Sequence, residues 1–441
     1  MDRFQILNPA ASLRWAVVAA LLSFPAEAWS DDWPQFRGLK RDNVWRETGL
    51  LNSIPPEGLK IRWRQPSGPG WSSPAVAEGR VFLTDAELAK PDARERVRCF
   101  DAVTGEVLWS YAYDVAYPEW AFVPGQGGGP TPTPVVEAGR VFTVGANSRV
   151  HCLDAATGAV FWDYDPRQKY QVRDMQCRGS PLIDGDRLIA FIETKPGACV
   201  IALDKKSGKE IWRAVDERVS NSSPLIVEAG GERQLIVWTD DSVTSLDPVT
   251  GEPWWREPMT TSNNDSVPTP VFDKNRLLIS GVMFELSTSE PTATMLWPGK
   301  DVAAPKRLLT NTGSPCLRGD HIYSAKLNGE LVCLAAKTGE IIWRDTTITS
   351  RKGGAAIHLI PIDDASAFFL FTDQGNLIRA QLTPKGYQEL GRALLIKPTT
   401  PFAGRDCAWA PPAFANRHVF VRNDNEILCA SLAAEETAPR Q

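Results

Sequence analysis

Hydrophobic and polar positions alternate along this chain in short runs, and one eleven-residue arrangement of them recurs. It begins with a small residue, usually has Asp at the third position, has Gly at the seventh and ends with Trp. Two apolar, alternating runs flank the polar D-x-x-T/S-G segment, whose Gly can adopt the positive φ of a tight turn. Each copy therefore predicts a β-hairpin, and the copies span residues 99–109, 152–162, 202–212, 245–255 and 333–343.

The Trp that ends each copy stands at one register of the second strand. A large ring at the same place in successive units is expected to pack across the joint between one unit and the next. Two stretches depart from the pattern, since residues 380–390 end in Leu and the stretch before Trp297 lacks the Gly. The residues to which we assign this structural role, called joint tryptophans below, are Trp63, Trp109, Trp162, Trp212, Trp255 and Trp343.

A second pattern precedes each hairpin and sets the length of the unit. A proline-led apolar segment is followed by a polar turn and another apolar run, as in SSPAVAEGRVF at Pro74 and PTPVVEAGRVF at Pro134. The clear copies recur every 43 to 60 residues, and weaker ones start near Ala355 and at Pro412. Repeats of about 40 to 50 residues are typical of four-stranded propeller blades. We predict an all-β, eight-bladed β-propeller of four-stranded antiparallel blades, in which the fifth and seventh blades are degenerate and their strand boundaries stay undefined.

The last unit lacks one strand, because the chain passes after Cys429 into an Ala- and Glu-rich tail. Residues 60–64 (KIRWR) precede the first full blade and alternate as a strand does, with Trp63 at the place of a joint tryptophan. We predict that this N-terminal strand pairs with the final blade and closes the ring. Closure leaves only short protected strand edges.

The A-x-D-x-x-T-G-x-x-x-W pattern resembles the tryptophan-docking signature of the bacterial pyrroloquinoline-quinone-type (PQQ-type) β-propeller repeat proteins. Residues 33–38 (WPQFRG) look like the segment that often precedes the first blade of that family. The chain is also similar to the propeller component of the outer-membrane β-barrel assembly machinery. The resemblance implies a scaffold that quinone-dependent dehydrogenases share with proteins that bind no quinone, so it predicts fold more sharply than function.

The N-terminus predicts export. Arg3 and Arg14 accompany an apolar run over residues 15–24, which is followed by the small-x-small triplet of residues 26–28. This arrangement is typical of a signal peptide, and ten apolar residues are too short to span a bilayer as a helix. We predict a signal peptide over residues 1–28, one propeller over 29–432 and a disordered tail over 433–441. The mature protein is expected to be periplasmic or extracellular, soluble and without a transmembrane anchor.

The positions of the cysteines and the net charge give predictions about disulfides and partners. Cys99, Cys152, Cys333 and Cys429 occupy the first place of the hairpin pattern, where sister units have Ala or Ser, so we expect small buried side chains there rather than disulfides. The sequence does not pair the remaining cysteines, which are Cys177, Cys199, Cys316 and Cys407. A formal net charge of −5 argues against nucleic acid as a partner.

Several sequence motifs of quinone-dependent dehydrogenases are absent from this chain. It has no adjacent Cys-Cys pair and no C-x-x-C-H motif for haem attachment. It also has no G-x-S-x-G elbow, phosphate-binding loop or EF-hand, and no pair of its four His residues has metal-ligand spacing. We therefore assign no catalytic and no metal-binding residue, and expect no cofactor, although PQQ with Ca²⁺ stays open as an alternative.

The segments just before each proline-led strand are candidates for a ligand-binding rim. In a propeller these segments ring one mouth of the central channel, and here they are polar and Gly-rich. Their guanidinium, amide and carboxyl groups and Trp faces suit a polar or anionic small molecule, a sugar or a peptide terminus. The candidates are Trp71, Gln126, Arg178, Asn221, Asn264, Asp265, Asn311, Arg351, Arg405, Asp406 and Trp409.

These observations favour an exported, non-catalytic propeller that acts as a binding or scaffolding module in the cell envelope. Its expected partners are envelope or secreted proteins, or else a polar small molecule or glycan. One alternative is a small PQQ-dependent quinoprotein dehydrogenase with Asp265 or Asp406 as the base. Another is a glycan-binding accessory protein that uses Trp71 and Trp409 as stacking faces.

Overall fold

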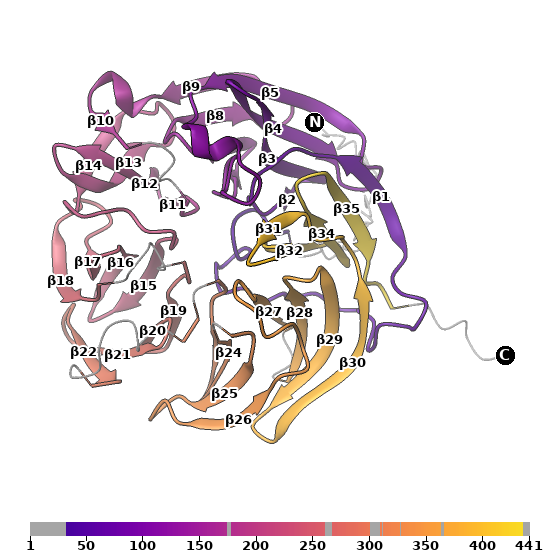
Figure 1. Cartoon of the computed structure of the whole chain (residues 1–441). Coiled ribbons are helices and arrows are strands. Elements are labelled where there is room, and N and C mark those ends of the chain that lie inside the picture. The colour runs from indigo at the N-terminus through magenta and orange to yellow at the C-terminus, as the bar shows by residue number, and fades with distance from the viewer. Residues whose placement is uncertain are drawn as a thin grey trace, which may run out of the picture.

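Eight antiparallel sheets stand around a central axis in the computed structural model, one beside the next (Figure 1). The structure describes residues 32–173, 178–260, 267–299, 309–310, 312–326, 328–362 and 366–434. Apart from two short 3-10 helices, η1 (Glu119–Phe122) and η2 (Pro166–Gln168), the regular structure of these residues is β. The predicted eight-bladed β-propeller is confirmed.

Each blade has four strands, numbered here from the axis outward, and blades are counted in chain order. Blade 1 contains β2 (Ala75–Ala77), β3 (Arg80–Ala89), β4 (Asp92–Asp101) and β5 (Val107–Val115). Blade 2 contains β6 (Val135–Glu137), β7 (Arg140–Val144), β8 (Val150–Asp154) and β9 (Val160–Tyr164). Blade 3 contains β11 (Leu182–Asp184), β12 (Arg187–Lys195), β13 (Ala198–Asp204) and β14 (Glu210–Ala214), and a short extra strand, β10 (Gln171–Val172), pairs with β12. Blade 4 contains β15 (Leu225–Ala229), β16 (Glu232–Trp238), β17 (Ser242–Leu246) and β18 (Pro253–Pro258).

The second half of the ring repeats this order. Blade 5 contains β19 (Val271–Asp273), β20 (Arg276–Ile279), β21 (Val282–Leu286) and β22 (Ala293–Trp297). Blade 6 contains β23 (Cys316–Arg318), β24 (His321–Ala325), β25 (Leu331–Ala335) and β26 (Ile341–Asp345). Blade 7 contains β27 (Ile357–Pro361), β28 (Ala367–Thr372), β29 (Asn376–Thr383) and β30 (Gly386–Leu394). Blade 8 contains β33 (Ala413–Ala415), β34 (His418–Arg422), β35 (Glu426–Ser431) and, from the N-terminal side, β1 (Ile61–Pro66).

Ring closure follows the predicted route. β1 is the outermost strand of blade 8 and pairs antiparallel with β35, in a register that runs from Ile61 opposite Ala430 to Pro66 opposite Glu426. The first and last strands of the ring are thereby held by main-chain hydrogen bonds within one sheet. The N-terminal strand closes the ring, as the alternation of residues 60–64 predicted.

Five of the six joint tryptophans reach the turn of the following blade. The Trp109 ring lies against Gly158, and its Nε1 donates to the Ala155 carbonyl at 3.1 Å. A Cβ on Gly158 would come within 2.6 Å of that ring, so this glycine provides close approach as well as its positive φ of 73°. The hydrogen bond recurs at other joints, where the Nε1 of Trp63, Trp162, Trp212, Trp297 and Trp343 donates to the carbonyls of Ala102, Lys205, Pro248, Ala336 and Thr383.

Trp255 behaves differently because blade 5 lacks the T-G turn. Its Nε1 donates to Gln234 Oε1 of its own blade at 2.8 Å, while its ring contacts Phe284 of blade 5. Trp297, in contrast, lies against Gly339 of blade 6, although its own hairpin has no Gly. The turn glycine therefore serves the preceding Trp and not the Trp of its own hairpin.

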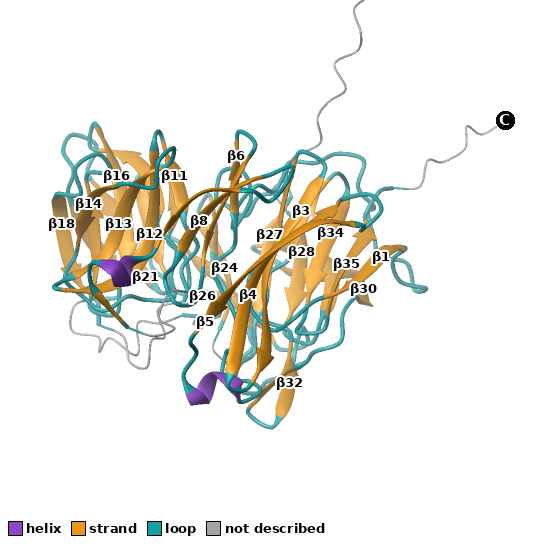
Figure 2. Cartoon of the chain, turned by 90° about the horizontal axis from the view of Figure 1, so that it is seen from above, coloured by secondary structure: helices purple, strands orange, loops and turns teal. Residues whose placement is uncertain are grey.

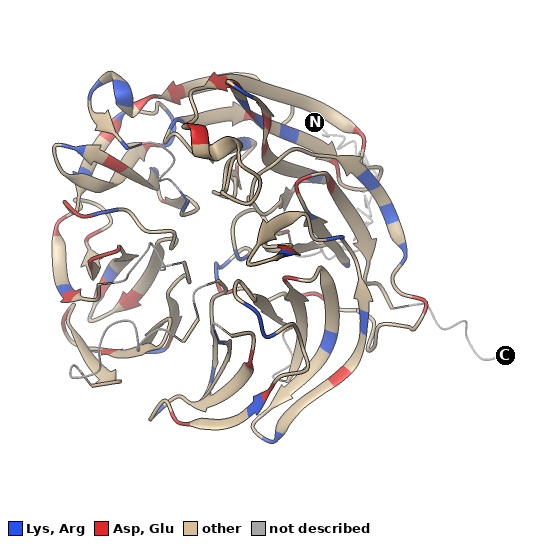
Figure 3. Cartoon of the chain, viewed as in Figure 1, with Lys and Arg blue, Asp and Glu red and all other residues tan. Residues whose placement is uncertain are grey.

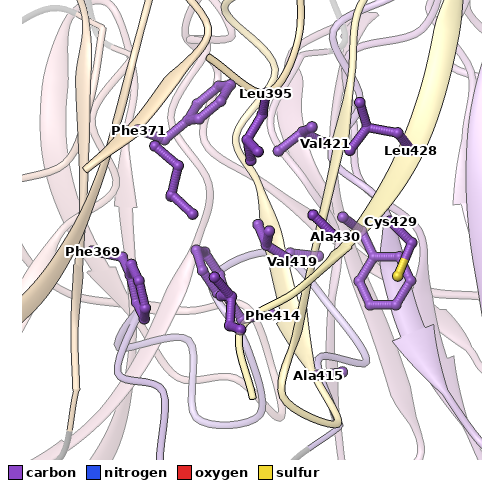
Figure 4. Close-up of a cluster of buried hydrophobic side chains, with 14 of the residues drawn as sticks. Phe369, Phe371, Leu395, Phe414, Ala415, Val419, Val421, Leu428, Cys429 and Ala430 are labelled. Carbon is purple, nitrogen blue, oxygen red and sulfur yellow. The ribbon is translucent and has the colours of Figure 1, made fainter. Parts of the chain in front are cut away.

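The main hydrophobic core lies where the ring closes. Inward side chains of blades 1, 7 and 8 form one buried cluster, part of which is drawn in Figure 4. Phe369 and Phe414 stack there at 5.8 Å, and the fully buried Trp45 packs on both. This cluster connects the segment before β1 to the last two blades.

The seven described cysteines are buried, and none of them forms a disulfide. Burial raises the pKa of Cys99 and Cys429 to about 12 and that of Cys333 to about 11. These thiols therefore act as small apolar side chains within the blades. Cys177 lies outside the described residues.

Two predictions about the chain ends also fall outside the described part. The signal peptide over residues 1–28 is one, and most of the tail over 433–441 is the other. Among the described residues no helix has the length and apolar character needed to cross a membrane. Acidic and basic side chains are interspersed around the ring (Figure 3), consistent with its small net charge.

Candidate functional site

A set of hydroxyl groups surrounds the central axis, two residues before the inner strand of several blades. Each hydroxyl oxygen accepts a hydrogen bond from the main-chain N–H of the preceding blade. The donor and acceptor residues are Ser73 to Thr133 (3.3 Å), Thr133 to Ser180 (3.0 Å), Ser180 to Ser223 (2.9 Å) and Thr269 to Ser314 (2.9 Å). These bonds fix the inner ends of neighbouring blades against one another, and each accepting hydroxyl keeps its own proton to donate.

These hydroxyls line a central cavity of about 470 Å³. Ser73, Thr133, Ser180, Ser223 and Ser314 form its ring of hydroxyls. The aromatic side chains that line it are Phe36, Trp71, Phe402 and Trp409, and the larger polar ones are Arg37, Asn43, Arg178, Asn221 and His358. The wall therefore combines apolar faces with hydrogen-bond donors, as small-molecule and peptide sites do.

The floor of the cavity is formed by the segment before β1. Its ends are anchored to blades 1 and 7, which flank blade 8: Trp33 exchanges two main-chain hydrogen bonds with Val76, and Trp45 N donates to the Pro361 carbonyl at 2.9 Å. Between them, Asn43 Nδ2 donates to the Leu359 carbonyl at 2.5 Å. We call residues 33–45 the floor segment, and they carry Phe36, Arg37 and Asn43 into the cavity.

Two arginines of the floor segment are buried against the inner blades. Arg37 donates to the Pro270 carbonyl of blade 5 at 3.3 Å, and Arg41 donates to the Pro181 carbonyl of blade 3 at 2.8 Å. Burial lowers the pKa of Arg37 to about 10, and burial together with the neighbouring Arg37 charge lowers the pKa of Arg41 to about 9. Both stay protonated at neutral pH, so the floor is positively charged.

Aromatic residues form one side of the wall near the mouth. Trp71 and Trp409 meet edge to face with centroids 5.2 Å apart, and Phe402 meets Trp409 edge to face at 4.9 Å. The Arg178 guanidinium lies over the Trp71 ring at 5.2 Å. Phe402 belongs to the hairpin of β31 (Thr400–Phe402) and β32 (Arg405–Cys407), which projects with η1 on one side of the ring (Figure 2). The two tryptophans thus contact each other, instead of standing as separate faces.

His358 lies behind this aromatic group. One ring nitrogen, Nε2, is 3.1 Å from the Trp409 carbonyl oxygen, and because a carbonyl only accepts, Nε2 must carry the proton. Burial lowers the pKa of His358 to about 4, so its ring is neutral at physiological pH. His358 therefore orients Trp409 without adding charge to the cavity.

The structure brings some of the predicted rim residues to the cavity and places others elsewhere. Trp71, Arg178, Asn221 and Trp409 line it. Asn264, Asp265 and Asn311 lie outside the described residues. Gln126, Arg351, Arg405 and Asp406 are described but do not line the cavity.

Ion pairs explain why two of these predicted residues do not line the cavity. Arg405 contacts the fully buried Asp373 at 2.5 Å, and Arg351 contacts Glu330 at 3.1 Å. Both guanidinium groups are thereby held against the blades, and Asp406 and Gln126 are exposed on the outside of the mouth. The structure therefore does not place Arg351 and Arg405 beside Arg178 at the cavity.

Sequence reasoning missed Phe36, Arg37, Asn43, His358 and Phe402 as lining residues. The only sequence signal for the first three was their place in and after the WPQFRG segment, which precedes the first blade instead of joining two strands. His358 and Phe402 belong to the degenerate seventh blade and its following hairpin, where no register identified an inward position.

The donor set fits an organic anion better than a metal ion. The described residues contain no group of three or more His, Cys, Asp or Glu side chains that could hold a metal. Among the described lining residues no carboxylate is present to ligate Ca²⁺, whereas guanidinium, hydroxyl and aromatic groups could contact a flat anionic ring. We therefore derive no reaction step through a quinone.

Sequence comparison finds relatives in two groups. The chain is 30% identical over 252 residues to outer membrane protein assembly factor BamB of Burkholderia pseudomallei, covering 54% of this chain and 60% of that protein. It is 25% identical over 312 residues to the quinoprotein alcohol dehydrogenase PedH of Pseudomonas putida, covering 59% of this chain and 49% of that one. The chain thus spans about half of the length of these relatives.

Solved structures of both groups share the fold. BamB from Moraxella catarrhalis superposes with a TM-score of 0.56 at 16% identity, over 87% of this chain and 99% of that one. The quinohemoprotein alcohol dehydrogenase of Comamonas testosteroni superposes with a TM-score of 0.63 at 13% identity, over 93% and 82%. At these identities the likeness shows the fold alone. A family model described as outer membrane protein assembly factor BamB matches residues 43–116 and 93–345, and the chain belongs to that family.

Proposed function

We propose that the protein is an exported, non-catalytic β-propeller that binds a partner protein in the cell envelope through the mouth of its central cavity. The observation that carries the proposal is the aromatic group at that mouth. Phe402 lies on a projecting hairpin, lines the cavity and keeps 43% of its surface exposed while packing on Trp409. A large exposed apolar side chain above a pocket is typical of an interface anchor. Membership of the BamB family supports a protein as the partner.

The first test is a pull-down from envelope extract of the source organism with the Phe402→Ser variant. We expect the mature protein to retain one defined partner and the variant to lose about nine-tenths of it, because aromatic anchors in interfaces commonly contribute 2 kcal/mol or more. The matched control is Leu394→Ser, which removes an even more exposed apolar side chain (65%) from the outermost strand of blade 7. The control should retain the partner.

Two results would contradict this proposal. If the wild-type protein retains no defined partner, the scaffold function is wrong. If both variants lose the partner equally, binding depends on general surface hydrophobicity and not on the mouth. Circular dichroism of the two variants confirms that each remains folded.

A small PQQ-dependent dehydrogenase is the second candidate, and its specific support is the match to quinoprotein alcohol dehydrogenases together with the aromatic and guanidinium lining of the cavity. The test is a titration of the mature protein with PQQ and Ca²⁺, followed by tryptophan emission. Because Trp71 and Trp409 line the cavity, a quinone bound there should quench part of the emission saturably. The leading proposal predicts no saturable quenching, and saturation would justify a dye-linked screen with alcohols and sugars.

A further inference from the structure

The floor segment places two buried guanidinium groups beside each other without a carboxylate partner. Arg37 and Arg41 are each only 5% exposed, and neither forms an ion pair with any described residue. They donate to the carbonyls of Ser180, Pro181 and Pro270 and to the amide oxygen of Gln35. Among the described residues, the Nε of each has no hydrogen-bond partner, and both guanidinium groups donate to neutral oxygens.

One carboxylate acts electrostatically on Arg37, that of the partly exposed Asp42, which forms its ion pair with Arg46. Arg37 lines the cavity from below, and Arg178 lines it from the side. The hydroxyls of Ser180 and Ser223 lie on the same wall and retain protons to donate. Among the described lining residues no acidic side chain faces these groups.

A buried cation without an anion is costly, and structures usually pair such a group or bring a counter-ion to it. Here the cavity is the space next to the unpaired charge. We propose that the floor of the central cavity is a binding site for the carboxylate group of an organic ligand, held by Arg37 and Arg178 with the serine hydroxyls. This proposal relies on neither the family membership nor the envelope partner, so it is independent of the proposed function.

A carboxylate suits the site better than a larger anion for two reasons. A planar guanidinium offers parallel N–H groups that match two carboxylate oxygens. Above the floor the wall is aromatic on one side, where Phe36, Trp71 and Trp409 offer contact to an apolar body attached to that carboxylate. The cavity, of about 470 Å³, is large enough to hold a small organic acid or the last residues of an extended peptide.

The test compares matched acid and amide probes by isothermal titration calorimetry at pH 7 and low salt. Benzoate against benzamide represents a small organic acid, and N-acetyl-dialanine with a free carboxylate against its C-terminal amide represents a peptide end. We expect at least one acid to bind roughly tenfold more tightly than its amide, because charge-assisted hydrogen bonds are about twice as strong as neutral ones. The pair that shows the larger difference identifies the source of the carboxylate.

Variants then locate the site. Arg37→Gln should reduce the affinity of the acid to that of its amide, while Arg344→Gln, which removes an exposed charge on the outer strand β26, should change nothing. Because Arg37 also holds the floor segment, Arg178→Gln on the wall is a second variant, expected to weaken the acid several-fold and to leave the fold intact.

The proposal is overturned if both acids bind no better than their amides, or if Arg37→Gln and Arg178→Gln both bind the acid as the wild type does. Loss of acid binding in Arg344→Gln to the same extent would also overturn it, since that result means a general charge effect. A wild-type protein that captures its envelope partner but shows no preference for acids would refute this inference alone.

Discussion

Replacing Gly158 with Ala is expected to lower the free energy of unfolding by about 3 kcal/mol, which combines overpacking with the cost of a left-handed backbone. Gly158 has a φ of 73°, and a Cβ there would lie 2.6 Å from the Trp109 ring, which is held in place by its hydrogen bond to Ala155. Either the ring or the turn must move. Denaturant unfolding followed by tryptophan fluorescence measures the change.

Gly139 supplies a matched control in the same blade. Its φ is 71°, nearly that of Gly158, but a Cβ there meets nothing within 4 Å. Gly139→Ala therefore costs only the left-handed conformation, about 1 kcal/mol. The difference between the two variants isolates the contact across the joint.

A double substitution checks the cause. In a Trp109→Ala background the added methyl group of Gly158→Ala has no ring to meet, so its cost should fall to that of Gly139→Ala. If Gly158→Ala destabilises no more than Gly139→Ala in the wild-type background, the close approach of ring and turn does not limit this joint.

The joints show why so much of the fold could be predicted. Gly at the seventh place and Trp at the eleventh recur at one register, so the unit, its hairpin and its orientation follow from local pattern alone. The pattern could not show that the Gly and the Trp of one copy contact different neighbouring blades. Gly158 packs against Trp109 of the preceding blade, whereas Trp162 packs against Gly208 of the following blade. Such pairing depends on how blades stack, which is a long-range property.

The degenerate fifth blade also shows that the contacts of a joint tryptophan depend on the turn of the next blade. It lacks the T-G turn, so Trp255 has no carbonyl of that turn to reach and bonds to Gln234 within its own blade. Trp297, whose own hairpin lacks the Gly, was not among the predicted joint tryptophans, yet in the structure it lies on Gly339. A defect in one copy therefore alters the tryptophan of the preceding copy.

The candidate site was less predictable, because a loop residue's direction depends on ion pairs that the sequence does not show. Arg178 lines the cavity, whereas Arg405 is held by the buried Asp373 at 2.5 Å. Arg37 reaches the cavity because its segment loops into the channel: between Trp33 beside blade 1 and Trp45 beside blade 7 it contacts blades 5 and 3. No repeat or periodicity in the sequence predicted the path of this segment.

A buried histidine gives the second large effect. His151 on β8 is fully buried, and its ring lies 4.3 Å from Tyr113 and 5.3 Å from Tyr111. Within the described part of the chain, neither ring nitrogen has a hydrogen-bond partner. Burial, reinforced by Arg149 and opposed by Asp163, lowers the pKa of His151 to about 4. The folded state therefore holds the neutral ring at pH values where the unfolded chain, with a pKa of about 6.5, binds a proton.

The sign of the pH dependence follows from this difference. Between about pH 6.5 and pH 4 the unfolded state carries more protons at this position, so the free energy of unfolding falls as the pH is lowered through that window. The loss from His151 amounts to about 3 kcal/mol by pH 4, on the order of two and a half pKa units at 1.36 kcal/mol each. The buried His358, whose pKa is also lowered to about 4, acts in the same direction.

Replacing His151 with Leu removes one of these titrations, so the free energy of unfolding of the variant should fall less steeply than that of the wild type between pH 7 and pH 4.5. Denaturant unfolding at several pH values measures the two slopes. Glu95, whose pKa is raised by burial beside Tyr113 and Tyr117, titrates in both proteins, and its contribution cancels in the comparison to the extent that the substitution leaves its surroundings unchanged. His321→Leu, on the partly exposed start of β24, is the control for the His-to-Leu substitution itself. Parallel curves for wild type and His151→Leu would show that the His151 ring is hydrated or paired in solution, and that the isolated ring does not govern acid stability.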